Sequence, residues 1–200
     1  MNLALQKHMN FKAAFFLTAI LFSFTAQAEI VRFVDVSEKL YRGSQPDSEA
    51  DYAKLKEKGI ETIINLRWDK SVAKSKEAAE ALGFKFYNVP IRGDARPTEE
   101  DIQKVFKEIN SEPNGKVYVH CTYGKDRTGL VGALYRVNQQ GWSVEDAKKE
   151  WIKLGFAHKV LHGLSSFFND HAEGNSAKLS NSEHANSAKL ICPRVFKAAL

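Results

Sequence analysis

The stretch "VYVHCTYGKDRTG", residues 117–129, decides the fold because it joins an apolar run to a basic, glycine-containing turn and then to a helix-forming segment. The run 116–121 is apolar enough to predict a central strand covered on both faces. Apolar residues then recur at helical spacing across 127–140, and Gly141 ends that helix. A strand, a short loop and a helix in this order indicate an α/β fold.

The rest of the chain also alternates predicted strands and helices, which favours one α/β domain with a central, mostly parallel sheet flanked by helices. Thr98 and Asp101 form a predicted capping box, and Ser143 with Asp146 caps another helix. The other predicted strands are 30–36, 38–42, 61–67 and 84–91. The other predicted helices are one that ends near Gly59, 71–83, one that starts near Thr98, one that follows Ser143, and 160–171.

The first 28 residues read as a cleavable secretory signal. Lys7 and Lys12 precede a short apolar run, and Ala26-Gln27-Ala28 supplies the small residues that signal peptidase accepts. We expect cleavage before Glu29, with Met9 as an alternative start. A membrane anchor is the competing interpretation, but the run is short for a span. The signal predicts a periplasmic or secreted protein with no stable membrane insertion.

Residues 29–174 are predicted to form the domain, and residues 175–200 a weakly ordered tail. The tail repeats "NSAKL" at 175–179 and 186–190 in polar, small-residue sequence. A docked strand or helix at 191–196 is the alternative. Removing the signal takes away two lysines and no acid, so the net charge falls from +5 to +3. This charge suits an anionic substrate and does not indicate a nucleic-acid partner.

The loop after Cys121 has the composition of a phosphate cradle. Backbone N–H groups of a short loop that leads into a helix N-terminus form a concave anion site. A cysteine at this place is favoured as thiolate, and Arg127 can hold two phosphate oxygens in its planar fork. We expect attack on phosphorus through a phosphocysteine. The expected phosphate-binding residues are Thr122, Tyr123, Gly124, Lys125, Asp126 and Arg127.

A structural disulfide is the other use of the thiol. The chain has two cysteines, Cys121 and Cys192, and export would favour their pairing. Against this pairing, Cys192 lies in the predicted tail, and a bridge would consume the thiol that the loop activates.

The match "HCTYGKDRTG", residues 120–129, resembles the active-site loop HCxxGxxRTG of the cysteine-dependent protein tyrosine phosphatase superfamily. The small domain is similar to the dual-specificity branch, and the resemblance covers about residues 30–172. A Walker A loop is excluded because GxxxxGK[ST] is absent.

The resemblance implies a role for each loop residue. Cys121 would be the nucleophile, Arg127 the phosphate clamp, and Thr128 a hydroxyl donor to the departing sulfur. His120 would orient the loop, or be a buried histidine with no catalytic role. Lys125 would bind a second phosphate group of the substrate, or point into solvent. The form "GKDRT" is similar to that of bacterial phosphatases that act on phosphoinositides as well as phosphoproteins.

A general acid should lie on a mobile loop across from the cysteine. Asp94, in "VPIRGDARPTEEDI", follows a predicted strand and precedes a capped helix, which is also the place of the acid in the superfamily. Asp69 of "LRWDK" is the rival, although it comes early in the chain.

The segment "YRGSQP", residues 41–46, is similar to an N-terminal signature of small bacterial, fungal and plant phosphatases. It would buttress the phosphate loop, with Arg42 or Gln45 reaching loop carbonyls. A plain turn built on glycine and proline is the alternative.

These residues predict a monomeric, metal-independent phosphomonoesterase without a cofactor, which acts on phosphotyrosine, and on phosphoserine or phosphothreonine, in proteins. Inositol phosphates or phosphoinositides are the alternative substrates, suggested by Lys125, Arg92 and Arg96. A pseudo-enzyme that binds phosphorylated partners without hydrolysing them is disfavoured by the intact Cys121, Arg127 and Asp94. Persulfide-based sulfur transfer would not require an arginine at this spacing.

Overall fold

The computed structural model describes residues 29–182 of the 200-residue chain, with side chains described as far as Ala172. The predicted signal and the region around Cys192 lie outside the described residues. The strands are β1 Val34–Asp35, β2 Leu40–Gly43, β3 Ile60–Asn65, β4 Lys85–Asn88 and β5 Lys116–His120; the helices are α1 Glu49–Glu57, α2 Ser71–Ala81, α3 Glu99–Asn110, α4 Arg127–Gln140, α5 Val144–Lys153 and α6 His162–Ser182, with a short 3₁₀ helix at Glu112–Asn114.

The five strands form one sheet in the order β1-β2-β5-β3-β4, with β5 in the centre. The pairs of β5 with β2 and β3, and of β3 with β4, are parallel, whereas β1 is antiparallel to β2. The expected mostly parallel sheet is therefore confirmed. His120 pairs with Gly43 on one side and Asn65 on the other, so the loops that follow β2, β3 and β5 leave the sheet at the same edge.

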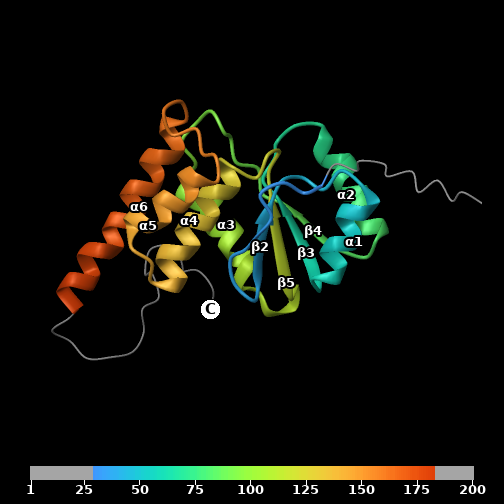
Figure 1. The fold of residues 1–200 in the computed structure, drawn as a ribbon, viewed down its shortest axis with the longest axis horizontal. Coiled ribbons are helices and arrows are strands. Elements are labelled where there is room, and N and C mark those ends of the chain that lie inside the picture. Colours follow the sequence, from blue (N-terminus) through green and yellow to red (C-terminus); the bar gives the residue numbers. More distant parts are fainter. Residues whose placement is uncertain (1–28, 183–200) are drawn as a thin grey trace, which may run out of the picture.

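The sheet separates two layers of helices, with α1 and α2 on one face and α3 to α6 on the other (Figure 1). Side chains of β5 alternate between the two cores, as expected for a strand covered on both faces. Val117 and Val119 join the core under α3 to α6, and Tyr118 joins the smaller core under α1 and α2. All three are fully buried.

The predicted helix caps are present. The Thr98 side chain accepts from the Asp101 amide, and Asp101 accepts from the Thr98 amide, which completes the capping box of α3. Ser143 likewise accepts from the Asp146 amide at the start of α5. Helix α4 has the predicted bounds, and Gly141 ends it in the left-handed region with φ 70°.

Two segments differ from the sequence prediction. The strand predicted at 30–36 is reduced to β1, because Val31 bonds through both its N–H and its carbonyl to Ser44 and Arg32 turns into the left-handed region with φ 56°. Helix α6 continues to Ser182, beyond the predicted end at His171 and through residues 175–182 of the predicted tail. Within residues 29–182, no helix is both long and apolar enough to cross a membrane.

Candidate active site

The loop between β5 and α4 is held from outside through its carbonyl groups. Each carbonyl from Cys121 to Lys125 accepts a hydrogen bond from a group beyond the loop. The donors are His120 Nδ1 to Cys121 O (3.1 Å), Gln45 N to Thr122 O (3.2 Å), Arg32 Nη1 to Tyr123 O (3.1 Å), Arg42 Nη2 to Gly124 O (2.7 Å) and Trp151 Nε1 to Lys125 O (2.8 Å).

This arrangement fixes the direction of the loop amides. In a planar trans peptide the N–H of one residue points opposite to the carbonyl of the residue before it, and no peptide bond of the described chain is cis. Carbonyls 121–125 face outward, so the N–H groups of 122–126 face the other way. In the part of the chain that the structure describes, none of these amides donates to a backbone acceptor. The loop is thus an anion cradle backed by the N-terminus of α4.

Gly124 allows the loop to approach β2. Its φ is 70°, a conformation that side chains rarely adopt, and an ideal Cβ at this position would overlap the main-chain carbonyl of Gly43. Only glycine fits both the turn and the contact between the two backbones.

Arg42 is a buried cation beneath the loop, with 1% of its surface exposed. Burial lowers the pKa of its guanidinium from 12.5 to about 10, while electrostatic interactions with Glu150 and Cys121 act in the opposite direction. Its Nε and Nη1 have no hydrogen-bond partner among the described residues. The prediction that the segment "YRGSQP" supports the loop is confirmed for Arg42, whereas Gln45 acts through its main chain and its side chain accepts from Arg67.

Cys121 and Arg127 lie at the two ends of the cradle. The thiol is 2% exposed. The Arg127 guanidinium donates from Nη2 to Thr122 Oγ1 (3.3 Å) and from Nη1 to Leu66 O (3.4 Å), so it spans the loop. Thr128 Oγ1 is buried and has no partner in the described residues, which leaves its proton available for another acceptor.

The predicted acid loop passes over Arg127, because an ideal Cβ at Gly93 would lie 3.7 Å from Arg127 Nε. Asp94 itself is exposed and paired with Arg92, which donates to its two carboxylate oxygens at 3.1 and 2.7 Å. The hydrogen bond from Arg92 lowers the pKa of the Asp94 carboxyl. In this conformation Asp94 is a carboxylate held outside the cradle.

Asp69, the rival acid, is held by its neighbours. It accepts the Ser71 amide at 2.9 Å and two bonds from the Arg67 guanidinium. Hydrogen bonds from Ser71 and then Arg67 lower the pKa of Asp69 to about 2. These contacts give Asp69 a structural role at the start of α2.

Of the other side chains at the loop, those of His120 and Asp126 bind main-chain groups, and those of Lys125 and Tyr123 lie near the surface. His120 is fully buried, and its Nδ1 donates to the Cys121 carbonyl; burial lowers the pKa of His120 to about 4, so the ring is neutral. The Asp126 carboxylate accepts the Ala157 amide at 3.2 Å, which ties the loop to the α5–α6 connection. The Lys125 amino group lies over the exposed ring of Tyr123, 5.9 Å from its centre.

Comparison with known proteins agrees with this geometry. The family model described as "DSP-PTPase phosphatase fused to NAD+ Kinase" matches residues 19–163. The chain belongs to this phosphatase family. It is a member of the dual-specificity-like branch of the cysteine-dependent protein tyrosine phosphatases, and it is a phosphatase, a hydrolase.

Curated and solved relatives are similar over most of the chain. The dual specificity protein phosphatase TpbA of Pseudomonas aeruginosa strain UCBPP-PA14 is 29% identical over 78% of this chain and 71% of its own length. A crystal structure of P. aeruginosa TpbA has a TM-score of 0.57 at 25% identity, covering 72% of this chain and 88% of that one. The catalytic core of the yeast phosphatase SIW14 shares the fold, with a TM-score of 0.61 at 18% identity over 78% and 95% of the two chains.

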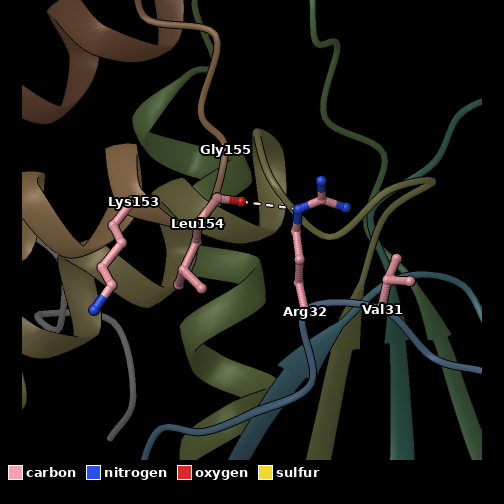
Figure 2. A pocket seen from close by; sticks show the side chains of 5 residues that line it. All are labelled: Val31, Arg32, Lys153, Leu154 and Gly155. Atoms are coloured by element: carbon pink, nitrogen blue, oxygen red, sulfur yellow. Dashed lines mark hydrogen bonds between the residues drawn. The ribbon is translucent and has the colours of Figure 1, made fainter.

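Two residues that support the phosphatase loop were not predicted from the sequence. Arg32 donates from Nε to Leu154 O (2.9 Å) and from Nη1 to Tyr123 O. Figure 2 shows the bond to the Leu154 carbonyl, at an open hollow of about 380 Å³. The amino group of Lys153 points away from Arg32 there. Trp151 is a buried residue of α5 whose indole Nε1 donates to Lys125 O. Its aromatic character predicts burial, but nothing in the sequence predicts its bond to the loop.

Metal ligands do not gather at this site. Over residues 29–182, no group of three or more His, Cys, Asp or Glu side chains is arranged to hold a metal ion. The cationic groups at the cradle include Arg127, Arg42, Arg32 and Lys125 of the chain itself.

Proposed function

We propose that this phosphatase hydrolyses phosphotyrosine in proteins through a phosphocysteine at Cys121. The observation that carries the proposal is the loop after Cys121, in which carbonyls 121–125 are all bound from outside and the amides of 122–126 therefore face the opposite side. Such a cradle binds the three non-bridging oxygens of a phosphoryl group and stabilises their charge in the transition state.

In the first step the Cys121 thiolate attacks phosphorus, and the bond from phosphorus to the tyrosyl oxygen breaks as the bond from sulfur to phosphorus forms. Arg127 binds two of the phosphoryl oxygens in its planar fork. The leaving oxygen takes a proton from Asp94. Phosphate replaces the Thr122 hydroxyl as the partner of Arg127 Nη2, since that bond is long at 3.3 Å.

In the second step water attacks phosphorus, Asp94 takes a proton from the water, and the sulfur departs as thiolate. The buried hydroxyl of Thr128 donates to the departing sulfur. Inorganic phosphate leaves and the enzyme returns to its starting state.

Asp94 must change partners to act as the acid. Its bond to Arg92 favours the carboxylate, so a productive complex requires Arg92 to turn toward the phosphoryl group. Loss of this cation and the approach of a phosphate dianion both raise the pKa of a carboxyl group. When Arg92 leaves Asp94 and binds the phosphoryl group, the Asp94 carboxyl group can approach the leaving oxygen of the substrate.

An aryl phosphate suits the surroundings of the loop better than a polyphosphorylated ring. Trp68 and Tyr123 are 60% and 61% exposed, and each has a cation over its ring, Arg92 at 5.8 Å and Lys125 at 5.9 Å. Exposed aromatic side chains beside a site provide faces for stacking an aromatic substrate. A TpbA variant has been solved in complex with phosphotyrosine.

A substrate panel tests this proposal. Initial rates are measured without added metal and with a chelator, on a phosphotyrosine peptide, a phosphothreonine peptide and inositol hexakisphosphate. We expect kcat/KM to be highest for the phosphotyrosine peptide and unchanged by the chelator. A higher kcat/KM for the inositol phosphate would replace the proposed substrate, and loss of activity with the chelator would overturn the mechanism.

We also propose that the phosphatase works as a monomer outside the cytoplasm after cleavage before Glu29. Ile30 is buried and donates its amide to Asp51, and Glu29 pairs with Lys54, so the folded domain includes the residues that follow this cleavage point. N-terminal sequencing of protein from the periplasmic fraction tests this: Glu29 as the first residue supports it, and a retained Met1 or Met9 contradicts it.

A further inference from the structure

The acid loop is attached to helix α6. The loop leaves the core at Ile91, which is fully buried, and returns to it at Pro97, which is also buried. Between them Asp94 is exposed and bonded within the loop to Arg92. Arg96, two residues after Asp94, makes the side-chain contacts between the loop and α6.

Three neighbouring residues of α6 hold the Arg96 side chain. Its Nη1 donates to Ser166 Oγ at 2.6 Å, its Nη2 pairs with Asp170 Oδ2 at 2.8 Å, and its guanidinium lies 5.3 Å from the centre of the Phe167 ring. An exposed ion pair alone contributes little. A hydroxyl, a carboxylate and an aromatic ring on one helix face fix both the position and the plane of a guanidinium.

The main chain of the loop also touches α6. An ideal Cβ at Gly163 would lie 2.5 Å from the Arg96 nitrogen and 2.8 Å from the Ala95 carbonyl carbon, so any larger residue would displace the loop. The helix is firmly packed at this point, because Leu164, Phe167 and Phe168 are 0%, 2% and 0% exposed. The part of α6 that contacts the acid loop is therefore packed into the core.

We propose that Arg96 is a positioning residue for the general acid, and that α6 sets the place from which Asp94 reaches the leaving oxygen. This inference rests on the proposed role of Asp94. The Arg96 guanidinium is bound by α6, and it anchors one end of the loop so that Asp94 and Arg92 move over a short and defined path. A misplacement of about 1 Å in a catalytic group can lower the rate by about 10²-fold.

The test compares two substrates that differ in their need for an acid. Phenyl phosphate has a leaving group of high pKa, whereas dinitrophenyl phosphate has a leaving group that departs without protonation. Arg96→Ala should lower kcat/KM for phenyl phosphate by about 10-fold, part of the effect of a misplaced group, and change that for dinitrophenyl phosphate less than about 2-fold. Asp170→Asn should act in the same direction, and Arg96→Lys, which retains a charge for Asp170, should recover part of the loss.

Lys104→Ala is the matched control. Lys104 also forms an exposed pair, with Glu100 at 2.8 Å on α3, and its loss changes the net charge equally. It should leave both rates unchanged. The double variant Asp94→Asn with Arg96→Ala should be no slower on phenyl phosphate than Asp94→Asn alone, because an anchor acts only through the group that it positions.

The outcomes separate the inference from the proposed function. If Asp94→Asn shows no dependence on the leaving group, the assigned acid is wrong and the inference falls with it. If Asp94→Asn shows that dependence and Arg96→Ala does not, or lowers both rates equally, only the anchoring role is refuted. Additive losses in the double variant would also refute it.

Discussion

The substitution Arg42→Met should lower the activity of the phosphatase while changing its free energy of unfolding little. Arg42 is a buried cation under the phosphate loop that has no ion-pair partner among the residues that the structure describes, and its Nη2 donates to the Gly124 carbonyl. Methionine fills a similar length of space with apolar atoms. The substitution therefore removes the charge and the hydrogen bond and leaves little cavity.

Two opposing contributions determine the change in stability. The fall of the Arg42 pKa from 12.5 to about 10 corresponds to a net cost of about 3 kcal/mol for the buried charge, at about 1.4 kcal/mol per pKa unit, and this cost is present at neutral pH. Methionine relieves it. Against this gain, the buried Gly124 carbonyl loses its donor, which costs about 1–3 kcal/mol. The net change in the free energy of unfolding should be within about 2 kcal/mol of zero.

Activity should respond differently. Without Arg42 the Gly124 carbonyl is no longer held outward, so the next amide turns away from the cradle, and the Cys121 thiolate loses a nearby positive charge. We expect kcat/KM to fall by about 10²-fold, the loss typical of one misplaced stabilising donor.

Urea denaturation and steady-state kinetics on the same preparation measure both effects. Arg136→Met is the matched control, because Arg136 is also buried but is paired with Glu150 at 2.9 Å. Breaking that pair should cost about 3 kcal/mol or more without lowering kcat/KM of the folded enzyme. The reasoning fails if Arg42→Met retains activity, or if it unfolds the protein as readily as Arg136→Met.

Two further predictions concern the acid and the buried histidine. Asp94→Asn should lower kcat/KM by about 10²- to 10⁴-fold for substrates with poor leaving groups and much less for dinitrophenyl phosphate, whereas Asp69→Asn should show no such dependence; the reverse pattern would make Asp69 the acid. Burial lowers the pKa of His120 from 6.5 to about 4, so the unfolded chain binds a proton in a pH range where the folded chain does not. Stability is therefore unaffected by this group above pH 6.5 and falls as the pH drops toward 4, by up to about 3 kcal/mol. Urea denaturation at pH 7 and pH 4.5 should show this loss in the native protein and a smaller one in His120→Gln; equal losses would contradict it.

The parts of the fold that the sequence predicts correctly depend on local signals. The central strand before Cys121 and the helix from Arg127 follow from hydrophobic pattern and glycine placement within a short stretch. Thr98 predicts the start of α3 because its capping partner lies three residues away. The cradle could be located for the same reason, since its amides and Arg127 are neighbours in sequence.

The supports of the cradle could not be predicted in this way. Arg32 and Trp151 reach the loop carbonyls from segments far away in the chain, and both contacts depend on how helices and strands pack. Arg32 also adopts a left-handed conformation, which costs a residue other than glycine about 1–3 kcal/mol. Because such a conformation is rare at an arginine, the sequence pattern predicted an extended strand there instead. Its bonds to Tyr123 and Leu154 offset this strain.

The state of the acid also required the structure. The position of Asp94 in the chain identifies it as an acid loop residue, but its bond to Arg92 and the attachment of Arg96 to α6 arise from side chains on the folded surface. Helix α6 itself was predicted too short, because Gly174 and the polar residues after it gave no helical periodicity.

Trapping the covalent intermediate tests the central claim most directly. The phosphatase is mixed with dinitrophenyl phosphate, quenched in acid during the first turnover, digested, and mapped by mass spectrometry beside Cys121→Ser as control. A single phosphoryl group on the peptide that contains Cys121, formed as fast as the burst of dinitrophenol and absent from Cys121→Ser, is the predicted result. Turnover by Cys121→Ser, or a burst with the phosphoryl group on another residue, would contradict the account.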